Sequence, residues 1–425
     1  MHDLILRNAR LPEGGDLVDI AIRKDKIVAV NHKVDGDCVT EIDLVGSLVT
    51  PPFVDSHFHM DSTLTYGQPR VNASGTLLEG IALWGELKPT LSVDEIKARA
   101  LRFCRWSIAR GTLAIRSHVD ISDDKLLAVQ ALLDVQAEMK PWIDLQLVAF
   151  PQDGFLRYAK SKENLTRALD MGVDVVGGIP HFERTMADGA ESVRQLCEIA
   201  ADRGLQVDMH CDESDDPMSR HVETLACETT RLGLEGRVSG SHLSSMHSMD
   251  NYYVSKLIPL MAEAKLHAIA NPLINITLQA RHDTYPKRRG MTRVKELMAA
   301  GINVSYGHDC VMDPWYSLGS HDMLEVAHMG LHVAQMTGQE EMQVSFDAVT
   351  KNPALALGLE NYGIAPGCNA DLVVLQCRNP IEALRLRPAR LYVIRRGEII
   401  ARTQPSDPIV TLNDQEERVN FILDS

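Results

Sequence analysis

The sequence is poor in aromatic residues and has no excess of positive charge. Phe, Trp and Tyr make up 5% of its 425 residues, and 43 lysines and arginines are set against 58 aspartates and glutamates, a formal net charge of −15. A surface this acidic repels phosphate backbones and anionic lipid headgroups. We therefore expect a partner that is a small molecule, with no nucleic acid and no membrane.

Long apolar runs and paired cysteines are also absent. No segment approaches the roughly 18 apolar residues of a membrane span, and the short run Leu4–Leu6 cannot form the core of a signal peptide. The eight cysteines are scattered, without a Cys-x-x-Cys pair. Because no export signal accompanies them, they are typical of reduced thiols, and we expect a cytoplasmic protein.

The two ends of the chain are rich in short β-strands separated by turns. Strands are expected at residues 3–6, 18–22, 26–30 and 41–45, and again at 391–395, 397–401 and 410–412, with a turn and strand at 363–375. Neither end can bury a sheet face alone. We predict one small β domain, sandwich-like in character, built from residues 1–50 and 363–425.

The middle of the chain, residues 51–362, alternates apolar β runs with helical periodicity. Helices are expected at residues 93–110, 126–139, 192–203 and 253–264. Eight alternating units favour a closed parallel barrel over an open sheet, so the predicted fold is a distorted (β/α)8 barrel. The eight strands are expected at residues 48–59, 113–117, 145–150, 173–179, 205–210, 238–242, 266–270 and 302–308.

Polar residues follow these strands at the edge where barrels of this kind carry their active sites. In the motif Asp55-Ser-His57-Phe-His59 the two histidines point to the same face of a strand and can grip one metal ion. His210 and Asp309, at the ends of the fifth and eighth strands, would complete three imidazoles and one carboxylate. Such a set suits one Zn²⁺ or Fe²⁺ ion and leaves a position for water.

Two further residues at this edge can take part in acid–base chemistry. Glu213 lies three residues beyond His210 and can shuttle protons if a dry pocket raises its pKa. His242 can hydrogen-bond a hydroxide at the metal. Taken singly, the His57–His59 pair and these two residues also have structural explanations. The pair can be surface histidines at a strand end, Glu213 a carboxylate at a helix start, and His242 a hydrogen-bonded core histidine.

Other residues at this edge are predicted to have structural roles. His118, His181 and His247 are expected to be hydrogen-bonded structural groups near the rim, and Tyr285–Gly290 a solvated loop. The fourth strand ends at Val175-Val-Gly-Gly-Ile-Pro-His181 without the lysine that two-metal barrels carbamylate. One metal ion is therefore predicted.

These stretches, in order, resemble the bacterial cytosine deaminases of the amidohydrolase superfamily over nearly the whole chain. The likeness is densest at residues 51–55, 144–152, 174–183, 210–213, 281–290 and 313–316. It implies the metal ligands named above, Glu213 as proton shuttle, His242 as the group that orients hydroxide, and Asp309 as both ligand and acceptor of the water proton. It also implies Gln152 as the amide that binds the pyrimidine, Leu77 and Trp315 as walls of the base pocket, and a homo-oligomer.

One position departs from that family. The residue after the metal-binding aspartate is usually a second Asp beside C5 of the base, and here it is Cys310. A methyl group would desolvate a carboxylate there, whereas a thiol is a small, soft hydrophobe that accepts it. We therefore hypothesise deamination of 5-methylcytosine to thymine in preference to cytosine to uracil, although Cys310 can also be a neutral change.

Three other functions are compatible with the same sequence. They are deamination of cytosine or isoguanine without a 5-methyl preference, hydrolysis of a cyclic amide, and a barrel that has lost its chemistry. The missing carbamate lysine and the pairing of Gln152 with Glu213 count against the second, and the intact ligand set counts against the third.

Overall fold

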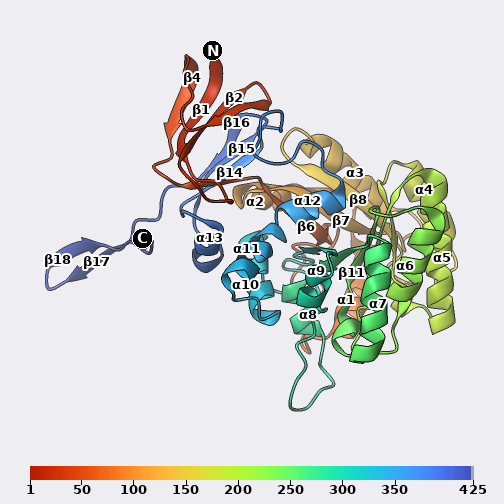
Figure 1. The fold of residues 1–425 in the computed structure, drawn as a ribbon. Coiled ribbons are helices and arrows are strands. Elements are labelled where there is room, and N and C mark those ends of the chain that lie inside the picture. Colours follow the sequence, from red (N-terminus) through yellow and green to blue (C-terminus); the bar gives the residue numbers. More distant parts are fainter. Residues whose placement is uncertain (423–425) are drawn as a thin grey trace.

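The computed structural model describes residues 1–422, and its centre is the predicted barrel of eight parallel strands (Figure 1). Each strand pairs with the next one in the chain, as expected when helical crossovers join parallel strands. In order they are β6 (Phe53–Phe58), β7 (Thr112–Asp120), β8 (Asp144–Phe150), β9 (Val175–Gly178), β10 (Gln206–Cys211), β11 (Val238–His242), β12 (His267–Ala270) and β13 (Asn303–Tyr306).

The first and last strands close the barrel through a short, irregular seam. Phe58 pairs with Asp309 in an isolated bridge, the Asp309 amide donates to the His57 carbonyl at 2.8 Å, and the His59 amide donates to the Asp309 carbonyl at 2.9 Å. Deeper in the seam, the Ser56 hydroxyl donates to the Tyr306 carbonyl. The seam therefore carries three of the four predicted metal ligands.

The predicted first strand, residues 48–59, is divided in the structure. β5 (Leu48–Thr50) ends at Pro51-Pro52 and joins a different sheet, while β6 begins at Phe53. Proline has no amide hydrogen to give to a sheet, so two in succession end the pairing.

Helices surround the barrel, and several begin at a capping side chain. Ser92 and Glu95 form a capping box at the start of α2, and Thr185 caps α5, which begins six residues before the predicted start at Ser192. The α-helices are α1 (Leu77–Leu87), α2 (Val93–Ala109), α3 (Leu127–Met139), α4 (Ser161–Asp170), α5 (Met186–Arg203), α6 (His221–Leu232), α7 (Asn251–Glu263), α8 (Pro272–Leu278), α9 (Val294–Ala299), α10 (Met323–Val333), α11 (Gln339–Asp347), α12 (Lys351–Leu357) and α13 (Pro380–Leu386). Short 3₁₀ turns are η1 (Lys88–Thr90), η2 (Pro180–Phe182) and η3 (Ser244–His247). Within residues 1–422 no helix combines the length and the apolar character that a bilayer span requires.

The β-rich ends form two sheets, in agreement with the sandwich-like domain expected. One has the order β3-β2-β1-β4, and the other has the order β16-β15-β14-β5. Their inner faces share one apolar core, which includes Leu6, Ile20, Leu372 and Ile394, as in a sandwich. The strands are β1 (His2–Ala9), β2 (Val18–Arg23), β3 (Lys26–Asn31), β4 (Cys38–Asp43), β14 (Leu372–Leu375), β15 (Arg390–Arg395) and β16 (Glu398–Arg402). The domain limits at residues 50 and 362 stay a prediction.

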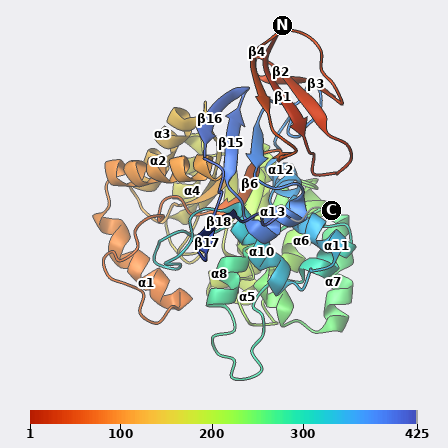
Figure 2. The same cartoon turned by 90° about the vertical axis from the view of Figure 1, so that its left-hand side faces the viewer.

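The last predicted strand, residues 410–412, lies outside the sandwich. It is part of β17 (Ile409–Leu412), which pairs only with β18 (Gln415–Arg418) in a hairpin that extends away from the body (Figure 1). All eight residues of the two strands are exposed. α1 and the loop between α8 and α9 lie at the end of the molecule opposite the sheet of β1–β4 (Figure 2).

Candidate functional site

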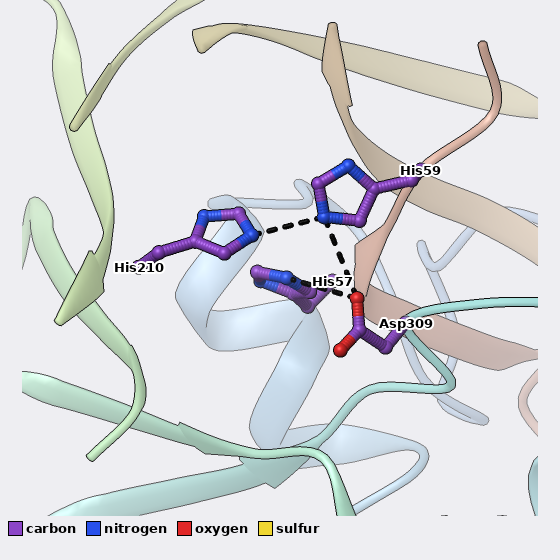
Figure 3. A group of neighbouring side chains, drawn as sticks. All are labelled: His57, His59, His210 and Asp309. Atoms are coloured by element: carbon purple, nitrogen blue, oxygen red, sulfur yellow. Dashed lines mark hydrogen bonds and ion pairs between the residues drawn. The ribbon is translucent and has the colours of Figure 1, made fainter. Parts of the chain in front are cut away.

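The four side chains predicted as metal ligands converge at the carboxyl end of the barrel (Figure 3). His57 and His59 come from the end of β6, His210 from β10, and Asp309 from the segment after β13. The Nε2 atoms of His59 and His210 are 2.9 Å apart, and Asp309 Oδ1 lies 3.4 Å from His59 Nε2 and 3.5 Å from His57 Nε2. All four residues are buried.

These four residues fit a divalent ion. Among the described residues, neither ring nitrogen of His57 has a hydrogen-bond partner, nor does Nδ1 of His210, although buried polar atoms normally have one. With ligands about 2.0–2.1 Å from Zn²⁺, neighbouring ligand atoms of a tetrahedron lie roughly 3.3–3.4 Å apart. The two spacings to Asp309 are close to that value, the two Nε2 atoms lie nearer to each other, and all four ligand atoms lie within 4.8 Å of one another, so the group can hold one ion.

A second cluster, of His57, His118 and Asp208, already contains a cation. The Arg116 guanidinium lies 2.9 Å from Asp208 Oδ2, and the Ser241 hydroxyl donates to Oδ1 of the same carboxylate at 2.7 Å. A metal ion there would be repelled by Arg116. Since β9 ends in two glycines and offers no lysine, the structure supports a single ion.

The histidines expected to be structural differ among themselves. His247 Nε2 donates a hydrogen bond at 3.0 Å to Asp215 Oδ1, as expected of a rim residue. His118 does not lie at the rim. It is fully buried among the rings of the predicted ligands, with its ring centroid 4.2 Å from that of His57, and neither of its ring nitrogens has a hydrogen-bond partner among residues 1–422. His181 lines the pocket described below.

Asp55, which the sequence interpretation passed over, holds the two ligand-bearing segments together. Its carboxylate accepts the backbone amides of His57 and His308, both at 3.1 Å, and contacts His321 Nε2 at 2.8 Å. One residue thus fixes the backbone beside His57 and beside Asp309. Its place two residues before His57 was the available signal.

Glu213, His242 and Asp309 form a row beside the ligand group. His242 lies between the carboxylates, with Nδ1 3.5 Å from Glu213 Oε1 and Nε2 3.8 Å from Asp309 Oδ2. The Asn275 amide donates to Nδ1 at 3.0 Å, which leaves the ring hydrogen on Nε2, the nitrogen on the Asp309 side. His242 can therefore present a hydrogen-bond donor, Asp309 an acceptor and Glu213 a titratable carboxyl to one reacting centre.

Burial sets the protonation states of this row. It raises the pKa of Glu213 well above its usual value, reinforced by repulsion from Asp309, which favours the protonated carboxyl. Burial also lowers the pKa of His242 well below its usual value and that of His59 to about 4, so both rings are neutral. Burial opposes ionisation of Asp309, but the neighbouring imidazoles of His242 and His57 prevail and lower its pKa.

A pocket opens beside these groups, and His59, His210, His242 and Asp309 form part of its lining. The four residues predicted to contact a base, Leu77, Gln152, Cys310 and Trp315, all line it together with Glu213. Its remaining wall is largely apolar, and the sequence did not indicate that wall because its residues come from α1, the η2 region and α8, without a shared motif. The additional lining residues are Leu78, Ile81, Ile179, His181, Phe182, Ile274 and Leu278.

Cys310 presents a neutral thiol to the pocket. The residue is 3% exposed, its Sγ lies 3.7 Å from Asp309 Oδ1, and burial raises the pKa of the thiol well above its usual value. Asp313 fixes the loop that follows, since its carboxylate accepts the backbone amides of Trp315 and Tyr316, both at 2.9 Å. The wall formed by Cys310 and Trp315 is therefore a rigid one.

Comparison with known proteins agrees with this geometry. The model of the amidohydrolase family matches residues 40–401. The chain belongs to the amidohydrolase family. N-isopropylammelide isopropyl amidohydrolase from Pseudomonas sp. (strain ADP) is 32% identical over 409 residues, which cover 95% of this chain and 98% of the relative.

Solved amidohydrolase structures are similar over almost the full length. The structure of 5-methylcytosine deaminase from Klebsiella pneumoniae with 5-fluorocytosine has a TM-score of 0.92 and 42% identity, covering 95% of this chain and 98% of the other. N-isopropylammelide isopropylaminohydrolase from Burkholderia multivorans has a TM-score of 0.82 and 29% identity, covering 95% and 99%. This amidohydrolase is thus a hydrolase that acts on carbon–nitrogen bonds, and its distorted barrel is confirmed.

Proposed function

We propose that this amidohydrolase is a metal-dependent deaminase of a free pyrimidine base, which converts 5-methylcytosine to thymine in preference to cytosine to uracil. The single observation that carries the proposal is the position of Cys310, whose neutral thiol lines the pocket that Glu213 and Gln152 also line. The likeness to 5-methylcytosine deaminase supports the same substrate.

The metal ion would be held by His57, His59, His210 and Asp309, and Zn²⁺ and Fe²⁺ both suit this ligand set. When bound, such an ion supplies Lewis acidity that allows water to ionise near neutral pH. The ionised Asp309 carboxylate accepts the proton that the water gives up. His242 donates from Nε2 to the oxygen that attacks C4, and so fixes its direction.

Glu213 supplies the proton that the base requires. Because its pKa is raised, the carboxyl is protonated and can deliver that proton to N3 of the pyrimidine as the oxygen adds to C4. Gln152 binds the edge of the base, and Leu77 and Trp315 enclose its faces. The proton held by Asp309 then passes to the amino group at C4, and the ionised Glu213 takes the proton of the C4 hydroxyl. The tetrahedral intermediate collapses to the C4 carbonyl with loss of ammonia, and both carboxyl groups return to their starting states.

Preference for the 5-methyl group follows from the chemistry of residue 310. A carboxylate beside C5 would lose hydration to a methyl group, at a cost on the order of 1–3 kcal/mol, whereas the thiol offers an apolar contact. One methyl group in a fitted pocket discriminates by roughly 10–200-fold. We expect the ratio of kcat/KM for 5-methylcytosine to that for cytosine to lie in this range.

The test is ammonia release from cytosine, 5-methylcytosine and isoguanine by metal-replete protein. The wild-type chain is expected to prefer 5-methylcytosine by roughly tenfold or more, and Cys310→Asp is expected to shift the preference towards cytosine. Cys227→Asp places the same carboxylate on the exposed side of α6 and serves as the matched control. An unchanged ratio in Cys310→Asp contradicts the proposal.

A second candidate is hydrolysis of an N-alkylated aminotriazine. It is favoured by the apolar wall of Ile179, Phe182, Ile274 and Leu278, which gives an alkyl substituent room beyond a pyrimidine ring, and by the N-isopropylammelide relatives. Release of isopropylamine from N-isopropylammelide, with no ammonia from any pyrimidine, would favour this function.

A further inference from the structure

One wall of the base pocket is a single helix contributed by the long loop after β6. Leu77, Leu78 and Ile81 of α1 line the pocket, and Gly80 lies against the indole of Trp315 so closely that a Cβ at that position would collide with it. The position of α1 therefore sets the width of the pocket, although none of its residues contacts the ligand group directly.

The carboxyl end of α1 is fastened by a lysine shared between two carboxylates. Lys88 Nζ lies 2.9 Å from Asp120 Oδ2 and 3.2 Å from Asp153 Oδ2, and Trp84 Nε1 donates to the same Asp120 oxygen at 2.9 Å. Asp120 ends β7 and is 4% exposed, and the side chain of Lys88 is 17% exposed. A charge pair this well shielded from water is held more firmly than one on the surface.

The two carboxylates belong to different barrel loops, and one of them adjoins the base-binding amide. Asp153 directly follows Gln152. The Asp153 amide donates to the Ser122 hydroxyl at 3.1 Å, and the Ser122 amide donates to Asp120 Oδ1 at 2.7 Å. The loops after β7 and β8 are thus tied to each other, and Lys88 ties both to α1.

We propose that Lys88 is a positioning residue for substrate specificity, which fixes the α1 wall and the Gln152 loop relative to each other. The inference rests on the proposed function of the pocket. Lys88 does not line the pocket, so it acts through Gln152 and α1. Replacing it by an uncharged residue leaves Asp153 free to turn to solvent and removes the tie between the two walls.

Steady-state kinetics of Lys88→Met test this role. We expect KM for 5-methylcytosine to rise roughly tenfold or more, with kcat changed far less, since binding in the ground state and the transition state suffers alike. Lys88→Arg keeps the charge and is expected to restore most of the loss. Lys256→Met breaks the 2.8 Å ion pair with Glu223 on the outer helices and is the matched control.

A double-mutant cycle shows whether Lys88 acts through Gln152. If it does, Lys88→Met has little further effect on kcat/KM once Gln152→Ala is present. Additive losses, or a loss that only follows the metal content or the folded fraction of the variant, overturn the proposal.

Backbone amide hydrogen exchange tests the role of Lys88 without a substrate, and so independently of the proposed function. In Lys88→Met the amides of α1 and of residues 152–155 are expected to exchange faster, while those of α7 stay unchanged and Lys88→Arg matches the wild type. Unchanged exchange in α1 overturns the role of Lys88 whatever the substrate. Faster exchange in a protein that turns over no pyrimidine supports that role and contradicts only the proposed function.

Discussion

At the amino-terminal end of the barrel, where its strands begin, two large buried polar side chains have hydrogen-bond partners in the protein. Arg116 donates to Gln146 at 2.7 Å and to Asp208 at 2.9 Å, and His267 has a partner at each ring nitrogen, Gly236 and Asn303. At the carboxyl end, where the strands finish, neither ring nitrogen of His57 or of His118 has a hydrogen-bond partner among the described residues.

The backbone differs between the two ends as well. His242 and Asp309, both in the site, have φ of 70°, in the left-handed region that residues other than glycine rarely adopt. Arg116 and His267 lie in regular strands. Buried polar groups whose hydrogen bonds are satisfied within the protein stabilise the barrel. Buried polar groups without such hydrogen bonds, together with strained backbone, indicate the end of the barrel that binds a ligand.

The largest expected effect is that of a substitution at the carboxyl end of the barrel, which should reduce activity without reducing stability. Glu213→Gln removes the proton donor but adds no buried charge, because burial already keeps the carboxyl protonated. We expect kcat to fall by roughly 10²–10⁴-fold, with the midpoint of urea unfolding unchanged. Glu235→Gln, at an exposed position, is the control. A large loss of stability in Glu213→Gln would contradict this division of roles.

A substitution at the amino-terminal end of the barrel, where the strands begin, is expected to reduce stability. Arg116→Met leaves Asp208 buried without its cation, which typically costs about 3–5 kcal/mol of unfolding free energy. Arg194→Met removes an exposed pair with Glu191, worth about 1 kcal/mol or less. Urea denaturation of the two variants measures the difference in unfolding free energy. Equal losses would show that the buried pair of Arg116 and Asp208 has no special role in stability.

Removal of the metal ion is expected to weaken the carboxyl end by a somewhat smaller amount. An ion present at 100–1,000 times its dissociation constant stabilises the folded state by about 3–4 kcal/mol. Chelation should therefore lower the melting temperature and abolish activity, and added Zn²⁺ or Fe²⁺ should restore both. In His59→Ala, which lacks one ligand, the melting temperature should respond much less to chelator.

The smallest effect is a pH dependence at the amino-terminal end of the barrel. Burial lowers the pKa of His267 below 6.5 in the folded protein, so the unfolded chain binds more protons as the pH falls. Its contribution to stability is complete above about pH 6.5 and is lost as the pH falls through that value. Melting temperatures at pH 7.5 and 5.5 should differ less for His267→Gln than for the wild type, and an equal difference would exclude this histidine as the cause.

The sequence predicted the barrel and its ligand positions because both follow local rules. Apolar strands ending in polar residues recur along the chain, and the parallel order of the barrel places those ends together. The likeness to cytosine deaminases added Gln152, Leu77, Cys310 and Trp315, and all four line the pocket.

What the sequence did not predict depends on contacts between distant segments. The order of the strands in the two sheets follows from which strands find each other. The run Ile409–Leu412 has the β-branched and apolar residues of a packed strand, although it forms a separate hairpin with residues 415–418. Arg116 and His118 lie on the same strand, β7, all of whose residues are buried. The sequence of this strand does not show that Arg116 has hydrogen-bond partners whereas His118 has none among the described residues.

The seam between β6 and β13 has a consequence for the order of events during synthesis. Ser56 and Tyr306, whose contact lies within it, are 250 residues apart in the chain. At roughly 5–20 residues per second, His57 and His59 leave the ribosome on the order of ten seconds or more before Asp309 does. Until Asp309 emerges, a nascent chain offers an incomplete set of the proposed ligands, so the site can be completed only late in synthesis.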